Sequence, residues 1–333
     1  MMKLSAMRTV CETILPGGRC PVVEEVLAPW DHDAGSDRFI VASSNFTASF
    51  TARDERRIVR FVRVDERSRE AIEAEMDFLL HVARNGMWVN LPIASRAGRH
   101  VERVGTSLGE YHAVVFDAMA GESRESGTLP ADLFEPWGRA LAELHCASEG
   151  YRDPRRPSWR DKLSQAEREL PVDDIAAHAV LRKLRTVLGA APATDRNYGL
   201  VHWDFCSDNI RWGGTRLGVI DFDDCAHDWH AADVAYALRD LFDDRASGVV
   251  PANPLLASFV RGYRSARRLD DEDLVLIPTF MLMSNLLFYS SLRIIVEEGR
   301  DDSEPEWVAV LRGMLQGKIQ KYREELELAA FSA

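Results

Sequence analysis

One short stretch of the sequence carries most of the side chains that could take part in a reaction. His202, Asp204 and Asn209 lie within eight residues of one another, and Asp221 ends the next apolar run. A carboxylate at Asp204 could orient or deprotonate an attacking hydroxyl group. The oxygens of Asn209 and Asp221 are of the hard type that Mg²⁺ prefers as ligands. These residue types at this spacing indicate phosphoryl transfer.

Other interpretations exist for the same residues. Each of His202, Asp204 and Asn209 taken alone is more often a loop cap or a turn former, and only their joint spacing ahead of Asp221 favours a catalytic loop. Asp221-Phe-Asp223 after an apolar strand is also similar to the nucleophile motif of haloacid-dehalogenase phosphatases. That fold places its motif near the start of a repeating βα pattern, which this chain lacks.

The elements that must position these residues fall into two groups. Strand patterns joined by polar turns predict an antiparallel meander with a following helix and two more strands, over residues 37–43, 47–52, 57–64, 68–84, 100–104 and 111–116. A short helix is expected over residues 1–15, and after Gly121 helical patterns predominate, among them one over residues 159–169. The order predicts an α+β protein with a small antiparallel β-rich N-terminal lobe (1–116), a connector (117–121) and a larger, mainly helical C-terminal lobe (122–333).

Composition excludes several classes of protein. The 333 residues are 46% hydrophobic and 28% charged, with a net charge of −12, which argues against a nucleic-acid partner. The five cysteines are scattered without a Cys-x-x-Cys pair, as expected for a reducing cytoplasm. The apolar run 274–295 contains several polar residues between acidic flanks. We expect it to be a buried helix, and we expect no membrane partner.

Two segments carry a family resemblance. LVHWDFCSDNI (200–210) and GVIDFDDC (218–225) resemble the aminoglycoside phosphotransferase and choline kinase-like superfamily of small-molecule kinases. The Asp-Phe-Asp-Asp sequence is similar to the branch of type II homoserine kinases and a bacterial stress-response kinase. Weaker similarities, such as WGRALAELH and DVAYAL, follow in the family's order. The resemblance implies a protein-kinase-like two-lobe fold that uses ATP and Mg²⁺.

The resemblance also implies roles for residues of the catalytic segment. Asp204 would be the catalytic base, and Asn209 with Asp221 would bind Mg²⁺. Asp223 would assist the metal site or bind substrate. Asp233, in DVAYAL, would bond the backbone of the catalytic loop.

Further implied roles concern the nucleotide. No lysine occurs between residues 4 and 161, so Arg60 would replace the strand lysine that holds the phosphates, with Glu75 as its helix partner. Arg63 is the alternative, and it has the opposite strand parity. The turn formed by Ser43, Ser44 and Asn45 would cover the phosphates with backbone N–H groups, although it lacks glycine. The connector would contact adenine through the backbone of Asp117, Ala118 and Met119.

The acceptor side is described by charge and by one bulky residue. Trp203 stands where the family has a small residue, and it would shape the acceptor pocket. Residues 201–250 hold ten aspartates against four arginines, and Asp223, Asp224 and Asp228 have no basic neighbour in the sequence. An acidic cleft attracts cations. It favours a neutral or cationic acceptor such as an amino alcohol, an amino sugar or an aminoglycoside-like antibiotic, unless these aspartates only cap helices or face solvent.

The sequence as a whole predicts an ATP- and Mg²⁺-dependent kinase that phosphorylates a hydroxyl of a small polar molecule. A protein Ser/Thr kinase of the bacterial stress-response type would share every one of these catalytic residues. A catalytically inactive nucleotide-binding module is the alternative that is not an enzyme. The sequence identifies neither the acceptor nor the oligomeric state.

Overall fold

The computed structural model describes residues 2–213, 216–241, 253–297 and 304–331. The chain divides into two compact units, and neither is continuous in sequence. The first unit comprises residues 1–77, 90–119 and 292–317, and the second comprises residues 78–89, 120–291 and 318–333. Each unit is described separately below.

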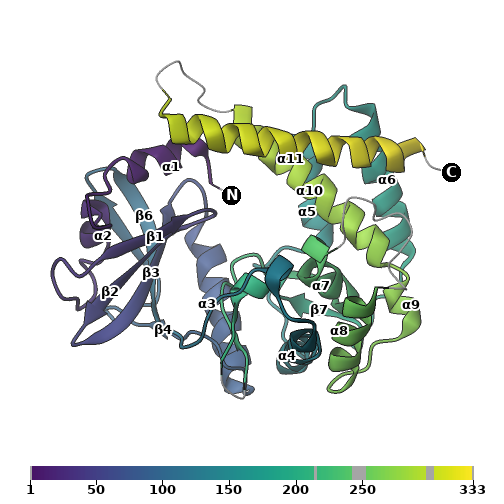
Figure 1. Ribbon diagram of the computed structural model, residues 1–333, viewed down its shortest axis with the longest axis horizontal. Helices are drawn as coiled ribbons and strands as arrows, with labels where there is room; N and C mark the ends of the chain where they lie inside the picture. Colours follow the sequence, from purple (N-terminus) through teal and green to yellow (C-terminus); the bar gives the residue numbers. More distant parts are fainter. Residues whose placement is uncertain (1, 214–215, 242–252, 298–303, 332–333) are drawn as a thin grey trace. The chain divides into compact units, whose positions relative to one another are not determined.

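The first unit is built on one antiparallel sheet (Figure 1). Its strands run in the order β1 (Arg38–Ala42), β2 (Phe46–Ala52), β3 (Glu55–Arg63), β6 (Gly109–Asp117) and β4 (Pro92–Ile93). The remaining strand, β5 (Glu102–Thr106), pairs with β6. The predicted antiparallel meander is therefore confirmed.

The two faces of this sheet differ in chemistry. Phe46, Phe50, Val59 and Phe61 point into an apolar core that also contains side chains of α1 (Leu4–Cys11) and α2 (Pro21–Val26). Because successive strand residues alternate between faces, Arg60 lies on the opposite face from Val59 and Phe61. The helix that follows the meander is α3 (Arg69–Arg84).

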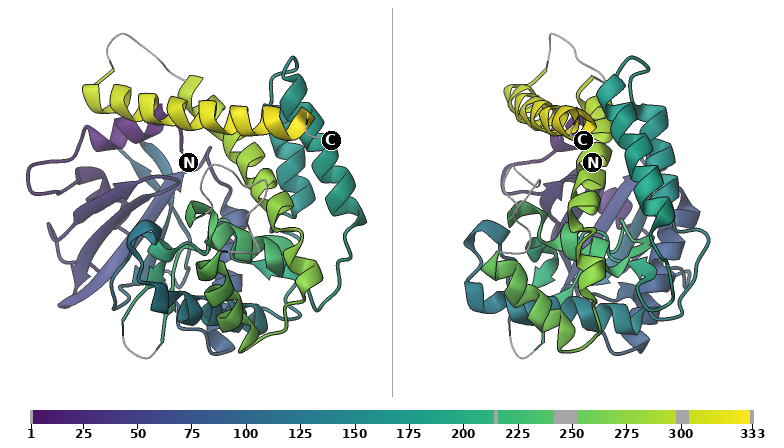
Figure 2. Two further views of the ribbon diagram at one scale, coloured as in Figure 1. Left: turned by 45° about the vertical axis from the view of Figure 1, so that its right-hand side comes forward. Right: turned by 90° about the vertical axis from the view of Figure 1, so that its right-hand side faces the viewer.

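The second unit is mainly helical. Its helices include α4 (Phe134–Ala147), α5 (Trp159–Glu169), α6 (Ile175–Ala190), α7 (His230–Ala237), α8 (Pro254–Arg264) and α9 (Asp271–Leu274). Residues 277–291 of α10 (Ile277–Glu297) and 318–331 of α11 (Glu306–Phe331) also belong to it. Figure 2 shows α5 and α6 running close to α10.

Two short pairs of strands complete the second unit. β7 (Tyr198–Val201) pairs with β10 (Ala226–Trp229), and β8 (Ile210–Arg211) pairs with β9 (Gly218–Val219), both antiparallel. The predicted catalytic segment therefore begins at the end of β7 and continues into the β8–β9 hairpin.

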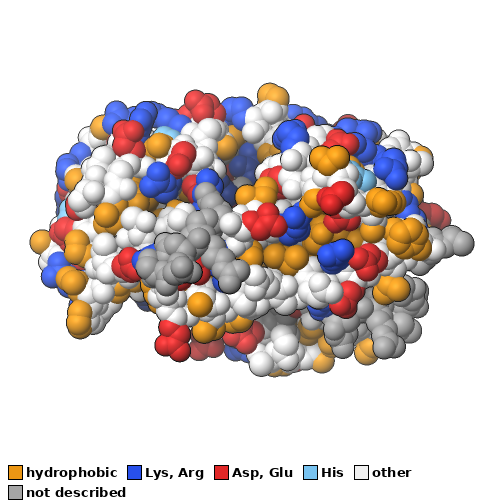
Figure 3. Space-filling view, turned by 90° about the horizontal axis from the view of Figure 1, so that it is seen from above, with side chains coloured by type: hydrophobic (Ala, Val, Ile, Leu, Met, Phe, Trp, Pro, Cys, Tyr) orange, Lys and Arg blue, Asp and Glu red, His pale blue; other side chains and the backbone are white. Residues whose placement is uncertain are grey.

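The apolar run near the C-terminus forms a continuous helical stretch with α9. Within the described ranges, residues 271–297 are the one helical stretch long and apolar enough to cross a membrane, and core helices of soluble proteins meet the same criterion. Several of its side chains, including Phe280, Met283 and Leu286, are buried. On the face drawn in Figure 3, basic, acidic and apolar side chains are interspersed.

Candidate active site

The predicted catalytic loop is tied at both ends to the strand that leads into Asp221. His202 is buried, and its Nε2 lies 3.1 Å from the carbonyl oxygen of Ile220. The backbone N–H of Ile220 donates to the carbonyl oxygen of Asn209 at 3.0 Å. These bonds bring Asn209 beside the residue that precedes Asp221, as the spacing predicts.

The carboxylate of Asp204 accepts hydrogen bonds from three side chains. Asn209 Nδ2 donates to Oδ2 at 2.9 Å, while Arg239 Nη2 at 2.5 Å and Cys206 Sγ at 3.2 Å donate to Oδ1. Burial raises the pKa of Asp204, but the charge and hydrogen bond of Arg239, together with the hydrogen bond from Cys206, outweigh burial and hold that pKa below its ordinary value. Asp204 is therefore an ionised carboxylate, fixed in one orientation.

Asp233 of helix α7 holds the backbone of the catalytic loop through hydrogen bonds. Its buried carboxylate accepts the backbone N–H groups of His202 at 2.9 Å and Trp203 at 2.8 Å. His145 Nε2 lies 3.0 Å from the same carboxylate. The predicted bond between Asp233 and the loop backbone is confirmed.

Two residues of the segment adopt left-handed backbone conformations that favour glycine. Trp203 has φ 72° and Asp221 has φ 64°. A non-glycine residue in this region costs roughly 1–2 kcal/mol, so the surrounding contacts must hold it. For Trp203 these include the bond to Asp233, a bond from Nε1 to Asp228 at 3.2 Å, and packing of the indole against Tyr236. The left-handed conformation of residue 203 explains why the family that the sequence resembles has a small residue at this position.

Asp228 belongs to the core beneath Trp203. Its side chain is fully buried and accepts hydrogen bonds from Trp203, Tyr236 and the backbone N–H of Trp229. Burial raises the pKa of Asp228 to about 7. The predicted contact of Asp228 with the acceptor does not fit this placement, because the carboxylate has no exposed surface and instead supports the residue before the base.

The oxygen atoms of the predicted metal ligands, Asn209 and Asp221, are of the type that binds Mg²⁺. The amide nitrogen of Asn209 donates to Asp204, and its amide oxygen has no partner among the described residues. A cation could bind this oxygen and the carboxylate of Asp221. The described parts of the chain hold no group of three or more His, Cys, Asp or Glu side chains suited to a metal. Two protein ligands suffice for Mg²⁺ when phosphates and water complete its shell.

Two aspartates follow Asp221 closely. Asp223 is buried, its carbonyl oxygen accepts Arg156 Nη2 at 2.6 Å, and Asp224 is half-buried. Their roles at the metal or the acceptor stay predictions.

In the first unit the structure brings Arg60 and Glu75 together. Arg60 Nη2 lies 2.5 Å from Glu75 Oε1 and 2.6 Å from Oε2. Glu75 is buried, so its charge needs this partner, and the guanidinium also lies 5.3 Å from the ring centroid of Phe116. Arg63 instead pairs with Asp65 at 2.9 Å. The pairing is as predicted, while the phosphate-binding role of Arg60 stays a prediction.

Some of the backbone N–H groups predicted to contact the nucleotide already donate to acceptors within the first unit. The N–H of Ser43 donates to the carbonyl oxygen of Asn45 at 3.1 Å, and the N–H of Asp117 donates to that of Leu91 at 3.0 Å. The Asp117 side chain pairs with Arg57. The N–H groups of Ser43 and Asp117 are therefore engaged inside the protein, and roles for Ser44, Ala118 and Met119 stay predictions.

Sequence reasoning missed Arg239, which contacts the predicted base directly. It is one of only four arginines among residues 201–250 and follows Asp233 by six residues. A search for the basic residue able to balance the acidic segment would have reached it, but no motif pointed to the pairing.

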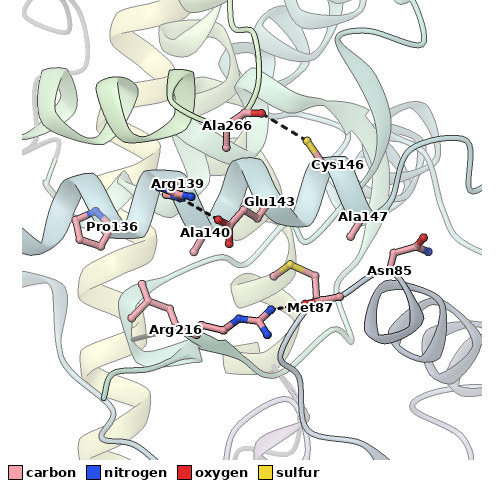
Figure 4. A pocket seen from close by; sticks show the side chains of 12 residues that line it. Asn85, Met87, Pro136, Arg139, Ala140, Glu143, Cys146, Ala147, Arg216 and Ala266 are labelled. Atoms are coloured by element: carbon pink, nitrogen blue, oxygen red, sulfur yellow. Dashed lines mark hydrogen bonds and ion pairs between the residues drawn. The ribbon is translucent and has the colours of Figure 1, made fainter. Parts of the chain in front are cut away.

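The second unit also contains a cavity of about 740 Å³ away from these residues (Figure 4). Its lining includes Arg139, which donates to Glu143 at 3.0 Å, and Cys146, whose Sγ lies 3.9 Å from the carbonyl oxygen of Ala266. None of the predicted site residues lines it, so it is not part of the candidate active site.

Comparison with known proteins gives a consistent result. Residues 39–270 match the phosphotransferase enzyme family. The chain is 25% identical to amicoumacin kinase of Bacillus subtilis (strain 168), over 81% of this chain and 84% of that protein. It is 30% identical to a homoserine kinase of Gluconobacter oxydans (strain 621H), over 61% of this chain and 65% of that protein.

Solved structures with the same fold support the architecture. Amicoumacin kinase hAmiN in complex with AMP-PNP, Ca²⁺ and Ami superposes with a TM-score of 0.76 at 22% identity, covering 92% of each chain. A microcompartment-associated aminopropanol kinase gives a TM-score of 0.64 at 23% identity, covering 92% of this chain and 98% of that one. The predicted protein-kinase-like, two-lobe α+β fold is confirmed.

Proposed function

This chain belongs to the phosphotransferase enzyme family, and we propose that it transfers the γ-phosphate of ATP, with Mg²⁺, to a hydroxyl of a small polar molecule. It is a small-molecule kinase. The observation that carries the proposal is the Asp204–Asn209 hydrogen bond beside the strand that leads into Asp221. The AMP-PNP and Ca²⁺ bound to hAmiN support a nucleotide and a divalent cation.

The residues present account for the steps that the protein itself must perform. In the transfer, the acceptor oxygen bonds to the γ-phosphorus, the bond to the bridging oxygen breaks to leave ADP, and the hydroxyl proton passes to Asp204. Because phosphoryl transfer has a loose transition state, orientation of the hydroxyl matters more than strong basicity. Asn209 and Asp221 would hold Mg²⁺, which neutralises phosphate charge. Arg60, oriented by Glu75, would hold the phosphates.

The acceptor class is proposed from both chemistry and relatives. We propose a small hydroxyl compound that carries an amino group, in the range of amino alcohols, amino sugars and aminoglycoside-like antibiotics. The aminopropanol named for one solved structure is an amino alcohol, and the homoserine named for several relatives carries an amino group and a hydroxyl. A protein acceptor is the alternative that the same machinery could serve. We also propose a cytoplasmic location, which the five free cysteines support.

Two substitutions test the proposed division of labour. Asp204→Ala should lower kcat by at least ~10²-fold while Mg-ATP affinity stays unchanged, because the base does not hold the nucleotide. Asp221→Ala should abolish Mg²⁺-dependent nucleotide binding, measured by calorimetry with AMP-PNP. Asp195→Ala is the matched control, because Asp195 is exposed and Arg152 is its one ion-pair partner among the described residues. Full ADP production by Asp204→Ala would show that this loop is not the catalytic loop.

A further inference from the structure

Helix α5 carries a lysine, Lys162, whose ammonium group contacts an aromatic ring. Lys162 is half-buried, and its Nζ lies 3.7 Å from the ring centroid of Trp203, the residue that directly precedes Asp204. Within the described residues the ammonium group of Lys162 makes no hydrogen bond or ion pair, whereas its backbone N–H donates to the carbonyl oxygen of Ser158. An ammonium group has three N–H donors, and the aromatic face satisfies them only in part.

The acidic residues around Lys162 do not supply the missing partner. Burial lowers the pKa of Lys162, while Asp224, Asp228 and Asp223 act in the opposite direction from beyond ion-pair distance. Asp228 is the most constrained of them, because its carboxylate is buried and already accepts three hydrogen bonds from other groups. Lys162 therefore keeps its capacity to donate to another oxygen.

The segment that carries Lys162 is fixed against the catalytic segment. Arg156 donates from Nη2 to the carbonyl oxygen of Asp223 at 2.6 Å and from Nε to that of Cys225 at 2.9 Å. The backbone N–H of His227 donates to the carbonyl oxygen of Pro157 at 2.8 Å. A capping box at Ser158 then starts α5. These bonds hold Lys162 beside Trp203, which distinguishes it from a freely moving surface lysine.

We infer that Lys162 binds a carboxylate of the acceptor, so that the preferred acceptor is a hydroxy amino acid rather than a simple amino alcohol. The inference rests on the proposed function and refines its acceptor class. A carboxylate oxygen would form the charge-assisted hydrogen bond that Lys162 lacks. A purely cationic acceptor would meet a like charge on the face of Trp203, which Lys162 already occupies. Asp228 does not oppose this, because its carboxylate is buried in the core and already accepts three hydrogen bonds.

The test uses two acceptors that differ only in the carboxylate. L-Homoserine and its decarboxylated analogue 3-aminopropanol are compared in a coupled assay of ADP release at saturating Mg-ATP. Wild-type protein should prefer L-homoserine in kcat/KM. Lys162→Met, which keeps the length of the side chain, should raise the KM for L-homoserine roughly 10- to 100-fold. The kcat/KM for 3-aminopropanol, the kcat for L-homoserine and the KM for ATP should stay unchanged.

Two further variants keep the test decisive. Lys162→Arg retains the charge and should retain most of the preference, which loss of folding would not allow. Lys183→Met, at an exposed position of α6, should behave as wild type. The inference is overturned if wild-type protein turns over neither compound, treats both alike, or loses activity toward both equally in Lys162→Met. If wild-type protein also fails to bind Mg-nucleotide, the proposed function fails with it.

Discussion

At the scale of single residues, the hydrogen bonds around Asp204 decide where an acceptor can bind. Arg239 and Cys206 both donate to Oδ1, whereas Asn209 is the one side chain that donates to Oδ2 among the described residues. Each carboxylate oxygen can accept about two hydrogen bonds. The remaining capacity therefore lies on Oδ2, and the acceptor hydroxyl would approach from that side.

Arg239 is accordingly a positioning residue, and its substitution should affect turnover more than binding. Arg239→Met removes the donors that orient the carboxylate, so kcat should fall roughly 10- to 100-fold while the KM for ATP stays constant. Arg239→Lys should recover part of the loss, because it keeps the charge but not the planar geometry. Steady-state kinetics with the best acceptor provide the measurement. Wild-type kcat in Arg239→Met would show that the ion pair has no role in the reaction.

At the scale of elements, α4 and α8 pack with their backbones in close approach. A Cβ added to Gly138 would lie 1.9 Å from the carbonyl oxygen of Phe259, and one added to Gly262 would lie 1.9 Å from that of Glu135. These two glycines permit the contact. His145 on α4, which holds Asp233, depends on this packing for its position.

Alanine at either glycine should therefore destabilise the protein. Gly138→Ala and Gly262→Ala force the two helices apart, and we expect each to lower the free energy of unfolding by about 1–3 kcal/mol. Gly317→Ala in α11 is the control, since nothing lies within 4 Å of its added Cβ and alanine favours a helix by about 0.5–1 kcal/mol. Denaturant titrations compare the three variants. Stabilisation by Gly138→Ala would contradict the observed packing.

The sequence predicted the elements where the pattern is local and regular. Helix α5 was predicted at its observed bounds, and β1, β2 and β3 lie within two residues of expectation. The expected helix over residues 1–15 ends earlier, at Cys11, and α2 was not predicted, because six residues around Pro21 give too short a pattern. Strand β10 was not predicted either, because its Ala-His-Asp-Trp sequence has no alternation of apolar and polar residues. Its partner, β7, also lies far from it in the sequence.

The same distinction applies to the candidate site. Asp204, Asn209 and Asp221 could be predicted because their spacing along the chain is itself the signal. Arg239 and Lys162 could not, because the first meets Asp204 and the second meets Trp203 only after the chain has folded. Asp228 looked like part of an acidic surface because sequence shows charge but not burial.

At the scale of the whole molecule, chain order and packing do not coincide. Residues 292–317 belong to the first unit although most of the surrounding chain belongs to the second, and residues 78–89 of α3 and its following turn belong to the second. No local pattern indicates such exchanges. The second unit also concentrates buried ionisable groups, among them His145, His230 and Asp228, so the folding of the chain is linked to pH.

Asp228 makes the sign of one such linkage testable. Burial raises its pKa from 3.8 to about 7, so between these values the folded protein keeps a proton that the unfolded chain has released. The contribution of Asp228 to the free energy of unfolding is therefore fully present below about pH 4. It is lost as pH rises toward 7, by at most about 1.4 kcal/mol per pH unit. Burial lowers the pKa of His145 and His230, which act in the opposite direction. Urea unfolding of Asp228→Asn and wild type across pH 4–8 isolates Asp228, because both histidines are common to the two proteins. The stability of wild type should fall relative to the variant as pH rises, and parallel curves would show that Asp228 is ionised in the folded protein.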